Sequence, residues 1–168
     1  PVLYQAFSGR EVAVTLLDAR AGSPPTAAGL LHRWSIGRDE ADLLQQLRGW
    51  ELWCAELLER HLSYPPLAFY RSQHDRESWL AALTTMLDTT AILVAGGRTP
   101  IAHAAWLAFA MARHAAIDLA QVQAGGHARP GMTRGPPPDL APLHATLAAA
   151  GRLDRDAESF AARLATLR

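Results

Sequence analysis

The sequence predicts an all-α protein, a helical bundle of six or seven helices around a central antiparallel hairpin. Apolar residues recur at helical spacing between residues 39 and 63, which is typical of an amphipathic helix. Residues 78–95 are apolar on every side and carry one charge, Asp88, so they are expected to form a buried helix. Proline and glycine mark the ends of these segments. With 168 residues, the chain is long enough to bury one sizeable core.

The long helix of this core is expected to begin at Asp39, whose side chain can cap free amide groups, and to end at Tyr64-Pro65-Pro66. Its buried face is predicted from a 4-3-4-3-4 spacing: Leu43, Leu47, Trp50, Cys54, Leu57 and His61. The apolar helix that follows is expected to start near Asp75 or Arg76. It should stop at Gly96-Gly97, a pair typical of a helix C-cap.

The N-terminal segment contains a capping-box pattern. Ser8 precedes Glu11 by three residues, ahead of an apolar run, and this spacing predicts a helix start there. The helix is expected to end at Gly22 and the Ser-Pro-Pro turn that follows it. The same run also alternates in a way that fits a short strand, which stays open as an alternative: Val12, Val14 and Leu16.

Two threonines predict further helix starts. Thr26 is expected to cap a short helix that closes at Gly37, and Thr99 a helix from Ile101 to about Gln123. The latter is rich in alanine and should pair with residues 78–95 as the antiparallel hairpin. Neither segment offers the roughly 20 uninterrupted apolar residues of a membrane span. The hairpin is therefore expected in a soluble core.

The C-terminal part is divided from the rest by a stretch rich in glycine and proline. Residues 125–138 are expected to form a loop. A helical core domain is predicted at 1–124, and C-terminal helices packed on or trailing the core at 139–168. Within this last part, two short helices are expected, at 139–150 and 156–167.

Composition excludes several classes of chemistry. The formal net charge is zero and there is no basic stripe, which argues against a nucleic-acid partner. All 16 basic residues are arginine, so lysine Schiff bases and P-loop lysines are excluded. The single cysteine, Cys54, excludes an internal disulfide and a cysteine-rich zinc site. We expect no cofactor.

Polar residues gather in the elbow between the two central helices, and they define the candidate site. One interpretation is a buried ligand-binding or catalytic site with shifted pKa values. The other interpretation is structural. Asp75 caps the next helix, Arg71 neutralises Asp88, and His61 is a hydrogen-bonded core residue. The cluster consists of His61, Arg71, His74, Asp75 and Asp88.

Other candidate sites carry weaker signals. His114 and Asp118 stand four apart and could share a metal, but His103 lies three turns away and cannot supply the third ligand. Ser72 near the elbow histidine lacks the G-x-S-x-G context of a nucleophile. Four tryptophans are expected in the core rather than in a stacking platform: Trp50, Trp53, Trp79 and Trp106.

Two stretches carry a family resemblance. HLSYPPLAFYRSQ, followed by ESWLAALTTMLD, resembles the soluble region after the pore in bacterial two-transmembrane ion-channel-like proteins of the potassium channel superfamily. Residues 1–3 look like the end of an inner pore helix, and the resemblance covers about residues 1–95. A TVGYG-like filter loop is absent from the sequence, so no conduction residue carries over.

The resemblance implies a non-enzymatic, cytoplasmic helical domain tethered to the inner membrane and acting in assembly or gating. Its expected partners are a second copy of the chain or the membrane portion of the same protein, with Val2, Leu3, Tyr4 and Phe7 as the contact surface. The chain opens with proline and without a signal peptide, so we expect a fragment. The alternatives are an all-α small-ligand-binding protein or enzyme using the polar cluster, and a free-standing helical interaction module.

Overall fold

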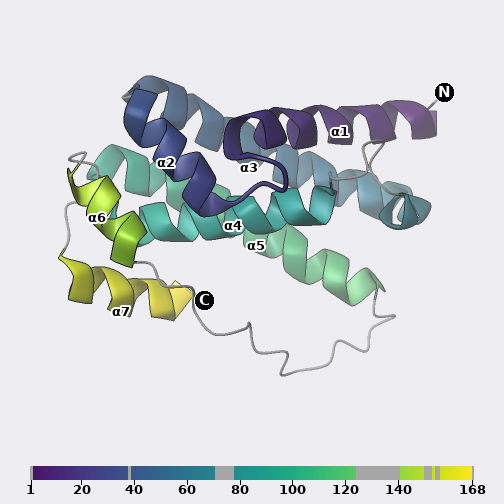
Figure 1. Ribbon diagram of the computed structural model, residues 1–168. Helices are drawn as coiled ribbons and strands as arrows, with labels where there is room; N and C mark the ends of the chain where they lie inside the picture. The colour runs from purple at the N-terminus through teal and green to yellow at the C-terminus, as the bar shows by residue number, and fades with distance from the viewer. Residues whose placement is uncertain are drawn as a thin grey trace.

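The computed structural model describes residues 2–37, 39–70, 78–123, 141–149, 153 and 156–167. These residues form seven α-helices and one 3-10 helix, and no strand occurs among them, which confirms the all-α helical bundle (Figure 1). In chain order the elements are α1 (Val2–Ala21), α2 (Ala27–Gly37), α3 (Glu40–Ser63), η1 (Pro65–Phe69), α4 (Trp79–Gly96), α5 (Thr99–Gln123), α6 (Ala141–Ala149) and α7 (Ala157–Leu167).

The core is built around α5, which packs extensively against both α3 and α4. Four of the seven residues on the buried face of α5 are alanine: Ala105, Ala108, Ala112 and Ala115. Because the distance between packed helices depends on the side chains at the contact, this face lets both neighbours approach closely. Ile101, Phe109 and Leu119 complete this buried face. Trp106 is 48% exposed, so its predicted place in the core is wrong.

The predicted limits of α3 are confirmed. The Asp39 carboxylate accepts hydrogen bonds from the amides of Ala41 and Asp42. Tyr64 ends the helix, and the two prolines begin η1. Every residue of the predicted stripe is buried, as are Trp53 and Leu58 beside it. Local capping and periodicity were sufficient to place this element.

The apolar helix α4 begins at Trp79, with the Ser78 hydroxyl accepting from the amide of Ala81, so a start near Asp75 or Arg76 is wrong. Trp79, Leu83 and Met86 are buried as expected, and Leu87 is partly buried. By length and composition α4 could cross a membrane, but 72% of it is buried inside the protein. Burial on that scale is also what a core helix of a soluble protein shows.

The helix α1 corrects two expectations. It begins at Val2, so Ser8 and Glu11 lie inside a continuous helix and the capping box is wrong. The strand alternative is wrong too. The helix ends before Gly22, whose φ of 101° lies in the left-handed region that glycine tolerates best. The buried face of α1 follows helical spacing: Arg10, Val14, Leu17 and Ala21.

Side chains hold α2 and the C-terminal helices against the core. Thr26 accepts from the amide of Gly29, as expected for a cap, and Thr85 of α4 donates to the carbonyl of Pro25. Phe160 of α7 joins the core cluster. At Gly96, the last residue of α4, an added Cβ would lie 2.8 Å from a ring carbon of Phe160. Glycine thus allows α7 to pack across the end of α4.

Candidate functional site

The most unusual polar group in the structure is Arg10, which lies on the buried face of α1 and is 1% exposed. Its Nε donates to Oε1 of Glu11 at 2.8 Å. Its Nη1 donates to the carbonyl of Leu67 at 3.0 Å, and its Nη2 to the carbonyl of Tyr70 at 3.1 Å. The guanidinium carbon also lies 4.9 Å from the centre of the Phe7 ring. These contacts satisfy a charge that would otherwise be costly to bury.

The contacts of Arg10 connect α1 with the turn after α3. Both carbonyls belong to η1 or to the residue that directly follows it. The Leu67 carbonyl also accepts from the amide of Tyr70, so Arg10 is its second donor. On the other side, the indole of Trp53 in α3 donates to the backbone carbonyl of Arg10 at 3.2 Å. One residue of α1 is therefore bonded to the middle of α3 and to the turn beyond its end.

His61 lies in the same junction and is 2% exposed. Its Nδ1 stands 2.7 Å from the carbonyl of Leu57, so in the neutral ring this nitrogen carries the proton and donates it. The ring centre lies 4.9 Å from that of Trp79, and Nε2 has no hydrogen-bond partner. Burial lowers the pKa of His61, and the nearby charge of Arg10 lowers it further, while the Leu57 carbonyl opposes the shift. The histidine is a neutral core residue with one bare acceptor.

The described residues do not bring His61 and Asp88 together. Asp88 is half-buried on α4, nine residues beyond Trp79. At 1.5 Å of rise per residue this is about 13 Å along the helix from the ring that His61 contacts. The other predicted members, Arg71, His74 and Asp75, lie outside the described residues, as does Ser72.

The second predicted pair lies on the surface. Nε2 of His114 and Oδ2 of Asp118 are 3.5 Å apart on α5, with side chains 61% and 34% exposed. The part of the chain that the structure describes contains no group of three or more potential metal ligands from His, Cys, Asp and Glu. Cys54 is fully enclosed, and burial raises the pKa of its thiol to about 12, which leaves it protonated and unreactive at neutral pH.

A cleft of about 760 Å³ lies between α1, α2 and the first half of α3. Leu17, Leu30 and Trp50 contribute apolar surface to its lining, and Arg20 and Asp42 contribute charges. Gly49 also lines the cleft, and a Cβ added there would meet no atom within 4 Å. Neither His61 nor Asp88, the described members of the predicted polar cluster, lines the cleft.

Comparison of the chain with protein-family models, with curated proteins and with solved structures found no match. Arg10 was not predicted to be buried, because it lies inside the expected capping box from Ser8 to Glu11. A usable signal was present, because Arg10 stands four and seven residues before Val14 and Leu17 and so continues their buried face.

Proposed function

We propose that the chain is a non-enzymatic helical domain on the cytoplasmic side of an ion-channel-like membrane protein of the inner membrane, where it acts in assembly or gating. The observation that supports the proposal is the pair of hydrogen bonds from Arg10 to the carbonyls of Leu67 and Tyr70. These carbonyls lie within HLSYPPLAFYRSQ, the stretch that resembles the channel-like proteins. These hydrogen bonds give that stretch a mechanical role, because they connect the N-terminal helix α1 to the turn formed by η1 and Tyr70.

The burial of Arg10 makes this connection stiff. Sliding α1 along its axis would remove the guanidinium from both carbonyls or pull the turn along. Breaking a buried charge interaction by removing one partner costs roughly 3–5 kcal/mol. Displacement of the turn with α1 is therefore the easier response. In the proposed protein, α1 would transmit movement between the membrane portion and the helices of the core.

The proposed mechanism takes α4 and α5 as a rigid antiparallel hairpin at the centre of the domain. Two residues separate the helices, from Gly96 to Thr99, and the helices pack against each other. Self-association or contact with the membrane portion would then change the position of α1 relative to this hairpin.

The test uses the full-length gene product reconstituted in liposomes. Ion flux is compared for the wild-type protein, a protein lacking residues 39–124, and an Arg10→Leu variant. We expect the deletion to change flux and Arg10→Leu to reproduce much of that change, because both uncouple α1 from the core. Arg20→Leu is the matched control, since it removes an exposed arginine of the same helix. A native protein without a membrane-spanning segment, or flux unaffected by the deletion, would contradict the proposal.

A second candidate function, small-ligand binding or catalysis in an all-α protein, has one observation in its favour. Nε2 of His61 is buried without a hydrogen-bond partner, and such a lone pair is an acceptor for a ligand N–H or O–H. NMR of the imidazole nitrogens tests this candidate. A change in the Nε2 shift when a cell metabolite extract replaces buffer would support it, and unchanged shifts would count against it.

A further inference from the structure

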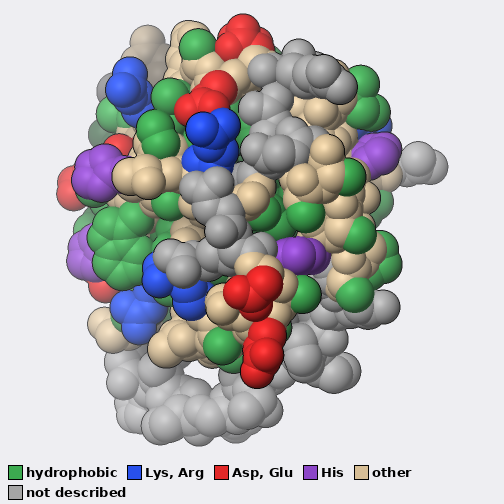
Figure 2. Space-filling view, turned by 90° about the vertical axis from the view of Figure 1, so that its left-hand side faces the viewer, with side chains coloured by type: hydrophobic (Ala, Val, Ile, Leu, Met, Phe, Trp, Pro, Cys, Tyr) green, Lys and Arg blue, Asp and Glu red, His purple; other side chains and the backbone are tan. Residues whose placement is uncertain are grey.

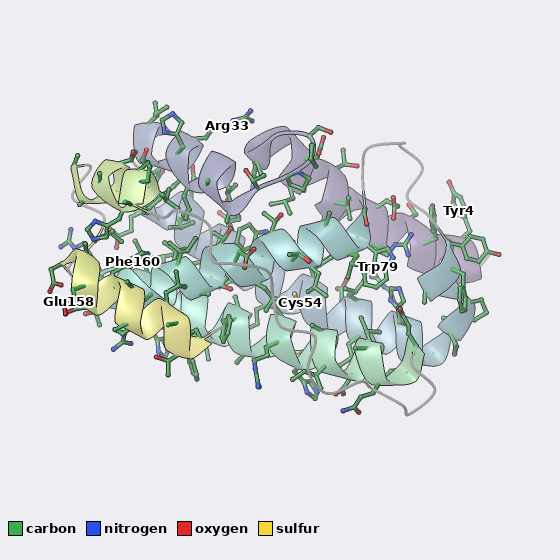
Figure 3. All side chains as sticks on the ribbon, turned by 60° about the horizontal axis from the view of Figure 1, so that its bottom comes forward. Tyr4, Arg33, Cys54, Trp79, Glu158 and Phe160 are labelled. Atoms are coloured by element: carbon green, nitrogen blue, oxygen red, sulfur yellow. The ribbon has the colours of Figure 1, made fainter. Side chains whose placement is uncertain are left out.

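Exposed aromatic side chains gather at one end of the molecule. The chain contains three tyrosines, and all three lie there: Tyr4 on α1, Tyr64 at the end of α3, and Tyr70 directly after η1. They are 68%, 37% and 50% exposed, and Phe69, at 86%, is the most exposed large apolar residue among those described. We call these four side chains the aromatic end. Figure 3 shows Tyr4 far from Glu158 and Phe160 on α7.

The two segments that form the aromatic end are free of charge. Neither residues 2–8 nor residues 62–70 contain an Asp, Glu, Lys or Arg, although 19% of the whole chain is charged. The opposite end differs, because acidic, arginine and histidine side chains are distributed over it (Figure 2). A partner that docks on the aromatic end must therefore be recognised without ion pairs from these segments.

The aromatic end is held in place by the junction described above. Leu67 is the buried residue of η1, and its carbonyl and that of Tyr70 accept from Arg10. The rings of Phe7 and Tyr70 meet edge to face with centres 6.4 Å apart. Phe69 lies between these anchored residues in the chain and is left projecting outward. Presentation of a large apolar side chain on a fixed support, rather than on a tail, is typical of a binding surface.

We propose that the aromatic end binds the headgroup layer of a lipid bilayer, with Phe69 inserted towards the acyl chains. The proposal rests on the function proposed above, and it names the surface against which the domain lies. Tyrosine favours this layer because its ring is apolar and its hydroxyl is polar. The absence of charge matches neutral lipid rather than anionic lipid, which is bound through basic clusters.

The size of the aromatic end favours lipid over a second protein. At roughly 200 Å² for a whole aromatic side chain, the exposed fractions of the four residues amount to about 500 Å². A stable protein–protein interface buries about 800 Å² on each partner. Insertion into a bilayer has no such threshold, because binding scales with the apolar area that enters the interface.

The experiment measures co-sedimentation of the 168-residue chain with neutral phosphatidylcholine vesicles. We expect binding that Phe69→Ser weakens about tenfold, because the substitution withdraws one phenylalanine from an apolar phase. Trp106→Ser is the matched control, since Trp106 is 48% exposed but lies beside Gly97 and Arg163, away from the aromatic end. It should bind as the wild type does, and raising the salt concentration should leave binding unchanged.

Three results would overturn the proposal: no binding to vesicles, equal binding by Phe69→Ser and the wild type, or a dimer in sedimentation equilibrium that depends on Phe69 without vesicle binding. Thermal unfolding of each variant shows that a loss of binding is not a loss of folding. The readout is separate from that of the proposed function. Vesicle binding with flux indifferent to residues 39–124 would refute the function alone, whereas dependent flux without vesicle binding would refute the membrane contact alone.

Discussion

The two ends of the bundle handle aromatic and charged groups in opposite ways. At the junction of α1 with η1, a charged side chain, Arg10, is buried and aromatic rings are left in solvent. At the end formed by α4 and α7, the aromatic Phe160 is buried against Gly96, while charged side chains lie outside. The second arrangement is what stability alone favours. The first places apolar surface in water and a charge in the core, and an unusual arrangement of this kind points to a binding role.

The largest expected effect is at the buried arginine. Arg10→Leu should lower the free energy of unfolding by roughly 3–5 kcal/mol, because it removes the cation of the buried ion pair with Glu11 and one donor from each of the carbonyls of Leu67 and Tyr70. Urea denaturation monitored by circular dichroism measures this. Arg20→Leu, at an exposed site of the same helix, should change stability by less than about 0.5 kcal/mol. Similar values for the two variants would show that the junction does not depend on the buried charge.

The opposite end should respond to volume rather than to charge. Gly96→Ala should lower stability by about 1–3 kcal/mol, because the new methyl group would lie 2.8 Å from the Phe160 ring and force α7 away from α4. The double variant Gly96→Ala with Phe160→Leu should recover part of this loss if the ring is the obstacle. A neutral effect of Gly96→Ala on the denaturation midpoint would contradict the close packing at this end.

The junction should also be sensitive to acid through His61. Its folded pKa is lowered from 6.5, first by burial and then by Arg10. Below pH 6.5 the unfolded chain takes up a proton that the folded protein does not, so stability should fall as the pH drops towards the folded pKa. His61→Phe, which keeps a ring beside Trp79, should flatten this part of the stability–pH profile. An identical profile for the variant would assign the acid sensitivity to other groups.

The smallest expected effect lies between the two ends, at the cleft. Gly49→Ala should raise stability by about 0.5–1 kcal/mol, because glycine is a poor helix former and an added Cβ meets no atom within 4 Å. A thermal melt measures the shift. A destabilised variant would mean that the cleft is narrower in solution. Gly49 thus provides a reference for the helix-propensity contribution to the Gly96 result.

Features encoded within a few residues were predicted well. Asp39 and Thr26 cap their helices as expected, because each cap needs only amides two or three residues away. The Tyr64-Pro65-Pro66 stop on α3 is equally local. The capping box at Ser8 failed because α1 is already helical from Val2, so the amides near Ser8 are not at a helix start.

Features that depend on distant partners were not predictable in this way. The alanines of α5 face α3 and α4 while Trp106 faces outward, because close approach of two helices outweighs the burial of one large ring. Asp88 lies on α4 about two and a half turns beyond Trp79. That its side chain is half-buried likewise follows from how α4 is rotated against its neighbours.

The sequence by itself determined that this chain is all-α, where its central helices stop, and which chemistries it lacks. Periodicity and caps depend on residues close together in the sequence, and composition depends on the sequence as a whole. Only the tertiary structure decided that Arg10 belongs inside and the tyrosines outside. The carbonyls that satisfy Arg10 stand 57 and 60 residues further along the chain. Whether a charge can be buried depends on partners that folding alone brings within hydrogen-bonding distance.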